Sequence, residues 1–304
     1  MEDFKNIKVF ASCHNHSTFS DAEQTPERLV EIAKELGHGG IILTDHDTVR
    51  GTYFVNKAAR KAGMMSILGC EFSTHLASDD TGVHLLGFDF NPDNKEMKEL
   101  LAFGSSVQTD RTKFLFHYGQ ERGTLRKGCT WQDVLDDHPY NDYICNNQVF
   151  VSMVKRGIYT PDEYQDVFFM PNFTNGNKEL KAKTLAAIGK SYHDIKTHEV
   201  VRIIKAAGGV PVVAHPHNQM KYAQEFLDMG VMGFETRFSG VTEEEFHFFE
   251  NLCAEKNLYT MGGSDHSGVL GGFLHVDPVE YAVPDHLSGI TEECFMKIYE
   301  RHLG

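Results

Sequence analysis

The feature that most constrains the fold is an alternation of short apolar runs with amphipathic helical patterns. Seven runs have the length of strands, at residues 7–12, 40–43, 66–69, 83–88, 210–214, 232–235 and 258–261. One intervening segment, TPERLVEIAKELG, opens with a capping threonine, Thr25, and a proline at the first helical position. Strand–helix alternation of this kind is typical of parallel strands with helices outside. The sequence therefore predicts a barrel-like α/β fold.

A long, mostly helical segment interrupts this alternation between residues 91 and 194. It contains patterns such as KEMKELLAFGSSVQTDRTKFLFHYGQERG, with no alternating strand between them. We expect a helical insertion subdomain at residues 91–194, which would cap a barrel made from residues 1–90 and 195–304.

Composition limits the partners of the protein. Its 43 acidic and 29 basic residues give a formal net charge of −14, which argues against binding to duplex nucleic acid. An acidic protein that handles phosphate needs cations from elsewhere, and metal ions are the obvious source. The opening MEDFKNIK lacks the apolar core of a signal peptide, no apolar stretch is long enough for a membrane span, and the six cysteines show no CxxC spacing. We expect a cytoplasmic protein with reduced thiols, and the oligomeric state stays open.

Two histidines and an aspartate follow the first apolar run, in the stretch CHNHSTFSD. His14 and His16 are two residues apart, so at the end of a strand they would project from the same face. That is the geometry of a chelating pair, with Asp21 five residues further on. On its own an HxH pair is more often solvated, so the rest of the chain has to decide.

Potential metal ligands accompany the other apolar runs as well. They are His46 in TDHD, Glu71 in GCEFS, His84 in VHLLGF, His215 in AHPH and Asp265 in GGSDH. In barrel-like α/β folds the carboxyl ends of the strands converge on one rim, where catalytic residues gather. Their joint placement predicts a metal centre at this rim.

The number and type of these side chains indicate more than one metal ion. Eight candidate ligands exceed the four to six positions of a single ion. Imidazole and carboxylate ligands without thiolate suit Mn, Fe or Zn, and Glu71 is placed to bridge two ions. Clustered divalent ions are typical of phosphate-ester hydrolysis, where they bind phosphate oxygens and acidify a shared water.

In these motifs the sequence resembles the PHP (polymerase and histidinol phosphatase) family of metal-dependent phosphoesterases. The motifs occur in the family's order over residues 7–90 and 195–270. The resemblance implies a distorted (β/α)7 TIM-like barrel, two or three divalent ions, with Mn expected ahead of Fe or Zn, and attack of a metal-bound hydroxide on phosphorus. It implies that catalysis depends on His14, His16, Glu71 and Asp265. The implied substrate is a small phosphorylated metabolite, a nucleotide or sugar phosphate, as a mono- or cyclic ester.

The last motif departs from the family pattern and bears on the third ion. It reads SDHSG, with Ser267 where the family has histidine and His266 one position earlier. A neutral hydroxyl is a poor ligand beside imidazole. We therefore expect two tightly held ions and a weaker third one at Asp21 and His46, completed by His266.

Two further departures bear on the substrate. The insertion has Asn146, Asn147 and Gln148 where the family carries a substrate-contacting Arg-Pro-His, and AHP is followed by His217 and Asn218 rather than Gly-Arg. Arg111, on an insertion helix, and Arg237, after a strand, are candidate phosphate contacts, because an arginine fork suits bidentate recognition. His217 is a candidate substrate contact and proton donor to the leaving group.

Three other functions are alternatives. A histidinol-phosphate phosphatase would use the same centre, and so would a nuclease acting on nucleic acid ends, although the acidic charge weighs against it. The third alternative is a catalytically weak metal-binding regulator, whose sequence would lack several of the family's metal ligands.

Overall fold

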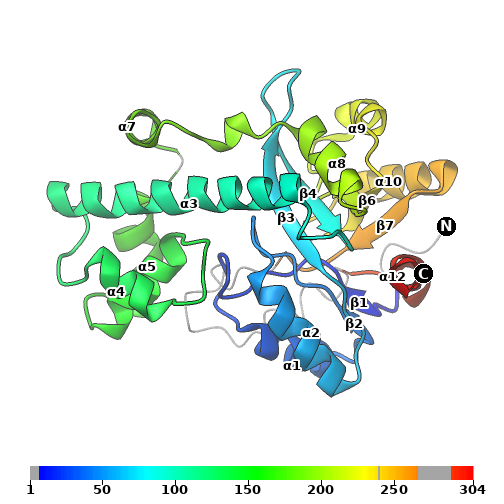
Figure 1. The fold of residues 1–304 in the computed structure, drawn as a ribbon, viewed down its shortest axis with the longest axis horizontal. Coiled ribbons are helices and arrows are strands. Elements are labelled where there is room, and N and C mark those ends of the chain that lie inside the picture. Colours follow the sequence, from blue (N-terminus) through cyan, green and yellow to red (C-terminus); the bar gives the residue numbers. More distant parts are fainter. Residues whose placement is uncertain (1–6, 175, 239, 266–288, 304) are drawn as a thin grey trace.

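The computed structural model describes residues 7–174, 176–238, 240–265 and 289–303, and its strands form two sheets (Figure 1). In the first, β1 (Ala11–Ser12) pairs in parallel with β2 (Gly40–Ile41). The second has the order β3-β4-β5-β6-β7 and contains β3 (Gly69–His75), β4 (Gly82–Phe88), β5 (Val210–Val213), β6 (Gly233–Arg237) and β7 (Tyr259–Gly262). The α/β class predicted from the sequence is confirmed.

The second sheet is mixed, so the prediction of parallel strands throughout was wrong. Strand β4 is antiparallel to both β3 and β5, whereas β5, β6 and β7 are parallel. The reason is the short connection between β3 and β4, at residues 76–81. A parallel pair needs a crossover of a dozen or more residues, and a link this short can only form a hairpin.

The strands of the described residues do not close into a barrel, which corrects the (β/α)7 expectation. The two sheets are nevertheless adjacent at both ends. Cys13 N, just after β1, donates to Gly262 O at the end of β7 at 2.9 Å, and a single bridge joins His46 to Glu71 in β3. The ladder is interrupted where the chain leaves extended geometry, since Asp47 and Asp265 both have φ of 50°.

The third strand also lies later in the sequence than residues 66–69, where we expected it. Strand β3 begins at Gly69 and therefore contains Glu71 rather than preceding it. Gly69 lies against the chain after β2, and a Cβ there would come within 2.7 Å of Leu43 O. Glycine allows this close approach of two backbones.

Helices cover both sides of the strands. Helices α8 (Thr197–Ala206), α9 (Ala223–Met229) and α10 (Glu243–Lys256) pack their apolar faces on the second sheet. The pair α1 (Pro26–Glu35) and α2 (Arg50–Ala62) packs beside β2, and α12 (Glu292–Leu303) lies near β1 and β7. The expected cap of α1 is present, because the Thr25 side chain accepts a hydrogen bond from Arg28 N. None of the helices within the described ranges combines the length and apolar character that a membrane span requires.

The segment between β4 and α8 is helical, as the sequence indicates. It contains the long α3 (Lys95–Arg122), then α4 (Trp131–Asp137), α5 (Asn146–Lys155), η1 (Pro161–Glu163), η2 (Tyr164–Phe169), α6 (Met170–Asn172), α7 (Lys178–Ile188) and η3 (Tyr192–Asp194). Helices α4 and α5 lie below α3, on the side away from α7 (Figure 1). A separate apolar cluster, drawn from residues 115–180, fills this part of the molecule. We keep the boundaries 91–194 as a prediction.

Candidate metal centre

The carboxylate of Glu71 is the centre of the candidate site. It is fully buried, and Oε2 lies 3.2 Å from His14 Nε2 and 3.1 Å from both His16 Nε2 and His46 Nδ1. These histidines follow β1 and β2, so two separate segments deliver them to the same oxygen. That Glu71 lies between two ions stays a prediction from the sequence.

The other oxygen of Glu71 faces two more histidines. Oε1 lies 2.9 Å from His84 Nδ1 and 3.1 Å from His215 Nε2. His84 stands near the start of β4, not at a strand end, and it reaches the site because β4 is antiparallel to β3 and β5. Its register places it next to the residues that follow β5. The structure thus brings both predicted histidines to Glu71.

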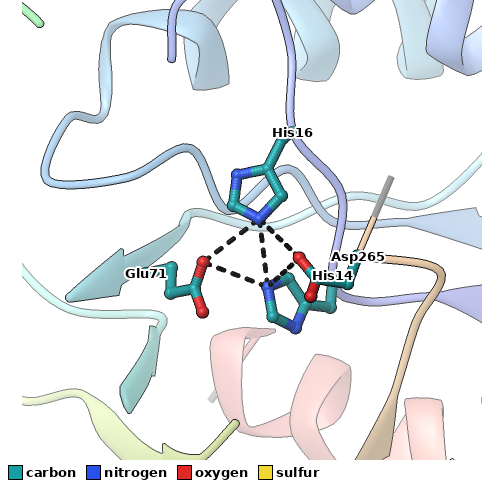
Figure 2. Close-up of side chains that lie close together, drawn as sticks. All are labelled: His14, His16, Glu71 and Asp265. Carbon is teal, nitrogen blue, oxygen red and sulfur yellow. Dashed lines mark hydrogen bonds and ion pairs between the residues drawn. The ribbon is translucent and has the colours of Figure 1, made fainter. Parts of the chain in front are cut away.

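Asp265 completes a four-residue group with His14, His16 and Glu71, shown in Figure 2. Asp265 Oδ1 lies 3.1 Å from His16 Nε2 and 3.4 Å from His14 Nε2, and the two imidazole Nε2 atoms are 3.1 Å apart. Gly263 permits this approach, since a Cβ there would come within 2.2 Å of His14 N.

Two smaller groups adjoin the first. His16, Asp21 and His46 form one, in which Asp21 lies 3.5 Å from His16 Nδ1 and 3.6 Å from His46 Nε2. His46, Glu71 and His84 form the other. Predicted ligand His266 and its neighbour Ser267 lie outside the described residues, so completion of the third site by His266 stays a prediction.

The donor set fits divalent cations. Imidazole nitrogens and carboxylate oxygens converge without thiolate, which suits Mn, Fe or Zn. Among the described residues, the ion-pair partners of Glu71, Asp21 and Asp265 are all histidines. Within that part of the chain, buried Glu71 Oε2 and His46 Nδ1 also lack a hydrogen bond of acceptable geometry. A cation between them would satisfy both atoms.

Protons stabilise the cluster where cations are absent. Burial by itself lowers the pKa of His14, but the carboxylates of Glu235, Glu71 and Asp265 together raise it well above its usual value. Burial favours the neutral form of Glu71, yet the surrounding histidines hold its pKa well below the usual range. Burial lowers the pKa of His46 to about 4, so this imidazole is neutral and ready to bind a metal at pH 7.

Glu235, in β6, is a site residue that sequence reasoning missed. It is fully buried, and its Oε2 accepts hydrogen bonds from His14 Nδ1 at 2.9 Å and from His215 N at 2.7 Å. The bond to Nδ1 leaves His14 Nε2 free to face the cluster, the usual way in which a carboxylate orients a metal-binding histidine. The available signal was a lone glutamate in the apolar run VMGFET.

Asp45, in the same TDHD segment as His46, is a second supporting residue that the sequence pattern did not predict. Its buried carboxylate accepts hydrogen bonds from Ser17 N at 2.7 Å, Ser17 Oγ at 2.8 Å and Ser20 Oγ at 2.6 Å. It thereby ties the chain between His16 and Asp21 to the segment that carries His46.

The three candidate substrate contacts lie outside the ligand groups. Arg111, on α3, donates to Phe173 O at 2.7 Å and lines a cavity of about 320 Å³. The guanidinium of Arg237 is buried over the Phe246 ring, 4.4 Å from its centre. His217 is 41% exposed, with Nδ1 3.4 Å from Glu245 Oε2. Their roles remain predictions.

Comparison with known proteins adds a family and several relatives. A family model described as PHP domain matches residues 12–197. The chain is 25% identical over 259 residues to a 5'-3' exoribonuclease of Haemophilus influenzae, covering 83% of this chain and 88% of that protein. It is 22% identical over 268 residues to a phosphoribosyl 1,2-cyclic phosphate 1,2-diphosphodiesterase of Eggerthella lenta, covering 86% and 96%. The crystal structure of a candidate metal-dependent phosphoesterase from Bifidobacterium adolescentis superposes with a TM-score of 0.70 at 25% identity, covering 96% of both chains.

Proposed function

The chain belongs to the PHP domain family and is a phosphoesterase of the PHP type; from this premise we propose that it hydrolyses a small phosphorylated metabolite. The proposed substrate is a nucleotide or sugar phosphate, as a monoester or a cyclic ester. The observation that carries the proposal is the convergence of five imidazoles and Asp265 on the buried carboxylate of Glu71.

The ligand groups suggest how the ions would be held. His14, His16, Glu71 and Asp265 would hold one ion, Glu71, His84 and His215 a second, and Asp21 and His46 a weaker third. When bound, divalent ions of this kind neutralise phosphoryl oxygens and lower the pKa of water for attack on phosphorus. Manganese is the proposed metal, with iron or zinc as alternatives.

Other residues of the chain would orient the ligands and move protons. Glu235 keeps the Nδ1–H of His14 directed away from the cluster. Half-exposed His217 follows His215 by two residues, and we assign it the protonation of the leaving group. Its neighbour Glu245 can hold the imidazole in place through Nδ1.

The cavity lined by Arg111 supports a small anionic substrate. Its basic lining side chains are Arg111, Lys181, Lys190, His75 and His193; outside the lining, Asp110 pairs with Lys190 and Asp80 with His193, both at 2.6 Å. His75 and Glu71 lie on the same face of β3, four residues and about 13 Å apart. A volume of about 320 Å³ is in the range of small-molecule sites, so the cavity could take the organic part of the substrate.

Turnover of a chemically defined panel tests this proposal. Protein reconstituted with Mn would be assayed against nucleoside and sugar monophosphates, histidinol phosphate, cyclic phosphodiesters and 5'-phosphorylated ribo-oligonucleotides. We expect a small ester to be hydrolysed with the highest kcat/KM. Failure of the manganese-loaded protein to hydrolyse any of them would overturn the proposal.

Short RNA is the second candidate substrate, because the Haemophilus influenzae relative is named a 5'-3' exoribonuclease. The acidic composition weighs against a long polyanion, whose binding needs clustered Lys and Arg. Mononucleotide release from the oligonucleotides at a higher kcat/KM than for every small ester would favour this candidate instead.

A further inference from the structure

The insertion contacts one part of the metal centre from two sides. We define the Asp21–His46 half-site as His16, Asp21 and His46, and the Asp21 loop as residues 17–21. Residues 141–148, which lead into and begin α5, touch both the Asp21 loop and the segment after β2 that carries His46. These contacts join parts of the chain more than ninety residues apart in the sequence.

Asn147 holds the backbone of Asp21 itself. Its side chain is almost fully buried at 3% exposure, and Nδ2 donates a hydrogen bond to Asp21 O. Its Oδ1 accepts from Tyr164 Oη at 2.7 Å and from Asn146 Nδ2 at 2.8 Å. Because both donors occupy the oxygen, the amide nitrogen is directed at the Asp21 carbonyl.

Gln148 holds the loop next to Asp21. It is 2% exposed, and Oε1 accepts from Cys145 N at 2.9 Å. Nε2 then donates to Thr18 O at 3.2 Å and to Ser20 O. Asn141 Nδ2 adds a second hydrogen bond to Thr18 O at 2.7 Å.

The insertion and the segment after β2 hold different backbone and side-chain groups of this loop. Asp45 accepts hydrogen bonds from the N–H and hydroxyl donors of Ser17 and Ser20. The carbonyl oxygens of Thr18, Ser20 and Asp21 instead receive amide donors from the insertion. The position of the Asp21 carboxylate therefore depends on side chains of α5.

The same segment also packs on the His46 side. The ring of Tyr143 stacks on His46 with 6.2 Å between ring centres and an interplanar angle of 21°. Asp142 accepts hydrogen bonds from Thr48 Oγ1 and Arg50 Nε, both at 2.7 Å. By contrast, His14 is oriented from β6, through Glu235.

We propose that Asn147 and Gln148 are positioning residues that set the metal affinity of the Asp21–His46 half-site. Both stand where the family resemblance led us to expect substrate-contacting side chains, and here their amides face the protein backbone. The proposal rests on the proposed function only in that Asp21 and His46 bind an ion. Loss of a residue that orients a metal ligand typically costs about 10–100-fold in metal affinity.

Calorimetric titration of the metal-free full chain with Mn²⁺ tests this. The titration separates classes of binding site by their Mn²⁺ affinity. The class whose affinity Asp21→Asn lowers most is assigned to the half-site. Asn147→Leu and Gln148→Met keep side-chain size and remove the amide donors. We expect each to weaken that class about tenfold or more and to leave the other ions at wild-type affinity.

Asn172→Leu is the matched control. Asn172 is a fully buried insertion asparagine whose Nδ2 donates to Phe168 O at 2.9 Å, but it does not touch the Asp21 loop. It should lower the Tm about as much as Asn147→Leu and bind Mn²⁺ as wild type does. Should the buried variants not fold, half-buried Asn141→Ala should weaken the same class by a smaller factor.

Three results would overturn the proposal: wild-type Mn²⁺ affinity in Asn147→Leu and Gln148→Met, equal weakening in Asn172→Leu, or no class weakened by Asp21→Asn. A failure of the proposed function would look different. It would leave these titrations unchanged while the manganese-loaded wild type hydrolysed no phosphate ester.

Discussion

At Glu71, protons and metal ions compete for the same atoms. His14 and His16 are buried, and the neighbouring carboxylates raise their pKa values well above the ordinary value. Metal binding requires neutral imidazole, so an ion that binds His14 and His16 must displace protons from them. Both the metal affinity and the stability of the metal-free protein should therefore depend on pH.

The metal-free protein should lose stability as the pH rises from about 6.5. A histidine whose pKa is raised on folding stabilises the folded state below its unfolded pKa, and this stabilisation disappears as the pH passes the folded pKa. Asp47 adds to the trend, since burial raises its pKa to about 8 and its ionisation destabilises the folded state. Thermal unfolding at a series of increasing pH values should show a falling Tm for the metal-free protein but not for the Mn²⁺-loaded protein. Over the same interval the affinity for Mn²⁺ should rise. A metal-free Tm that stayed constant or rose over this interval would contradict the assignment.

Removing the charge of Glu235 should weaken metal binding without a change at any ligand. Glu235→Gln replaces the carboxylate that accepts the hydrogen bond from His14 Nδ1, so the imidazole becomes less basic and its ring is held less firmly. Changes of this kind cost about 10–100-fold in metal affinity. Mn²⁺ titration measures the effect. Glu250→Gln is the control, since Glu250 accepts a hydrogen bond from Thr236 in the same strand, away from His14. Equal affinities in the two variants would show that Glu235 does not support the centre.

At the scale of elements, the sequence allowed the position of the ligands to be predicted better than the pairing of the strands. His84 was expected in its strand and is found there, but the direction of β4 depends on the short link at 76–81. Periodicity does not distinguish parallel from antiparallel partners. The start of β3 was missed because Gly69 and Cys70 resemble the end of an apolar run, whereas Gly69 is needed for close packing against Leu43.

Arg111, on helix α3, is expected to contribute to substrate affinity. Arg111→Ala should raise KM tenfold or more for the best phosphorylated substrate, because a charge-assisted hydrogen bond contributes about 1.5–3 kcal/mol. Steady-state kinetics on the panel described above would measure it. Arg122→Ala, on the same helix and also bonded to a backbone carbonyl, should leave KM unchanged. An unaltered KM in Arg111→Ala would show that the cavity residue does not contact substrate.

In the whole molecule, the metal ligands of the α/β part and the helical insertion follow from sequence patterns, but the contacts between them do not. Nothing in the local sequence of Asn147 or Asp45 indicates that both support the Asp21 loop, because their partners are distant in the chain. The strongly acidic composition is compatible with phosphate binding if metal ions are bound. Divalent ions, rather than clustered Lys and Arg, would supply the positive charge that phosphate binding needs.

The number of Mn²⁺ ions retained per chain, compared between wild type and Glu71→Gln, shows whether the metal centre is built around this carboxylate. Glu71 belongs to two of the three ligand groups and faces five histidines, so wild type should retain at least two ions. Glu71→Gln should lose at least one of them while remaining folded. Glu245→Gln, a buried carboxylate outside the groups, should retain the wild-type number. Wild-type metal content in Glu71→Gln would contradict a metal centre built around this carboxylate.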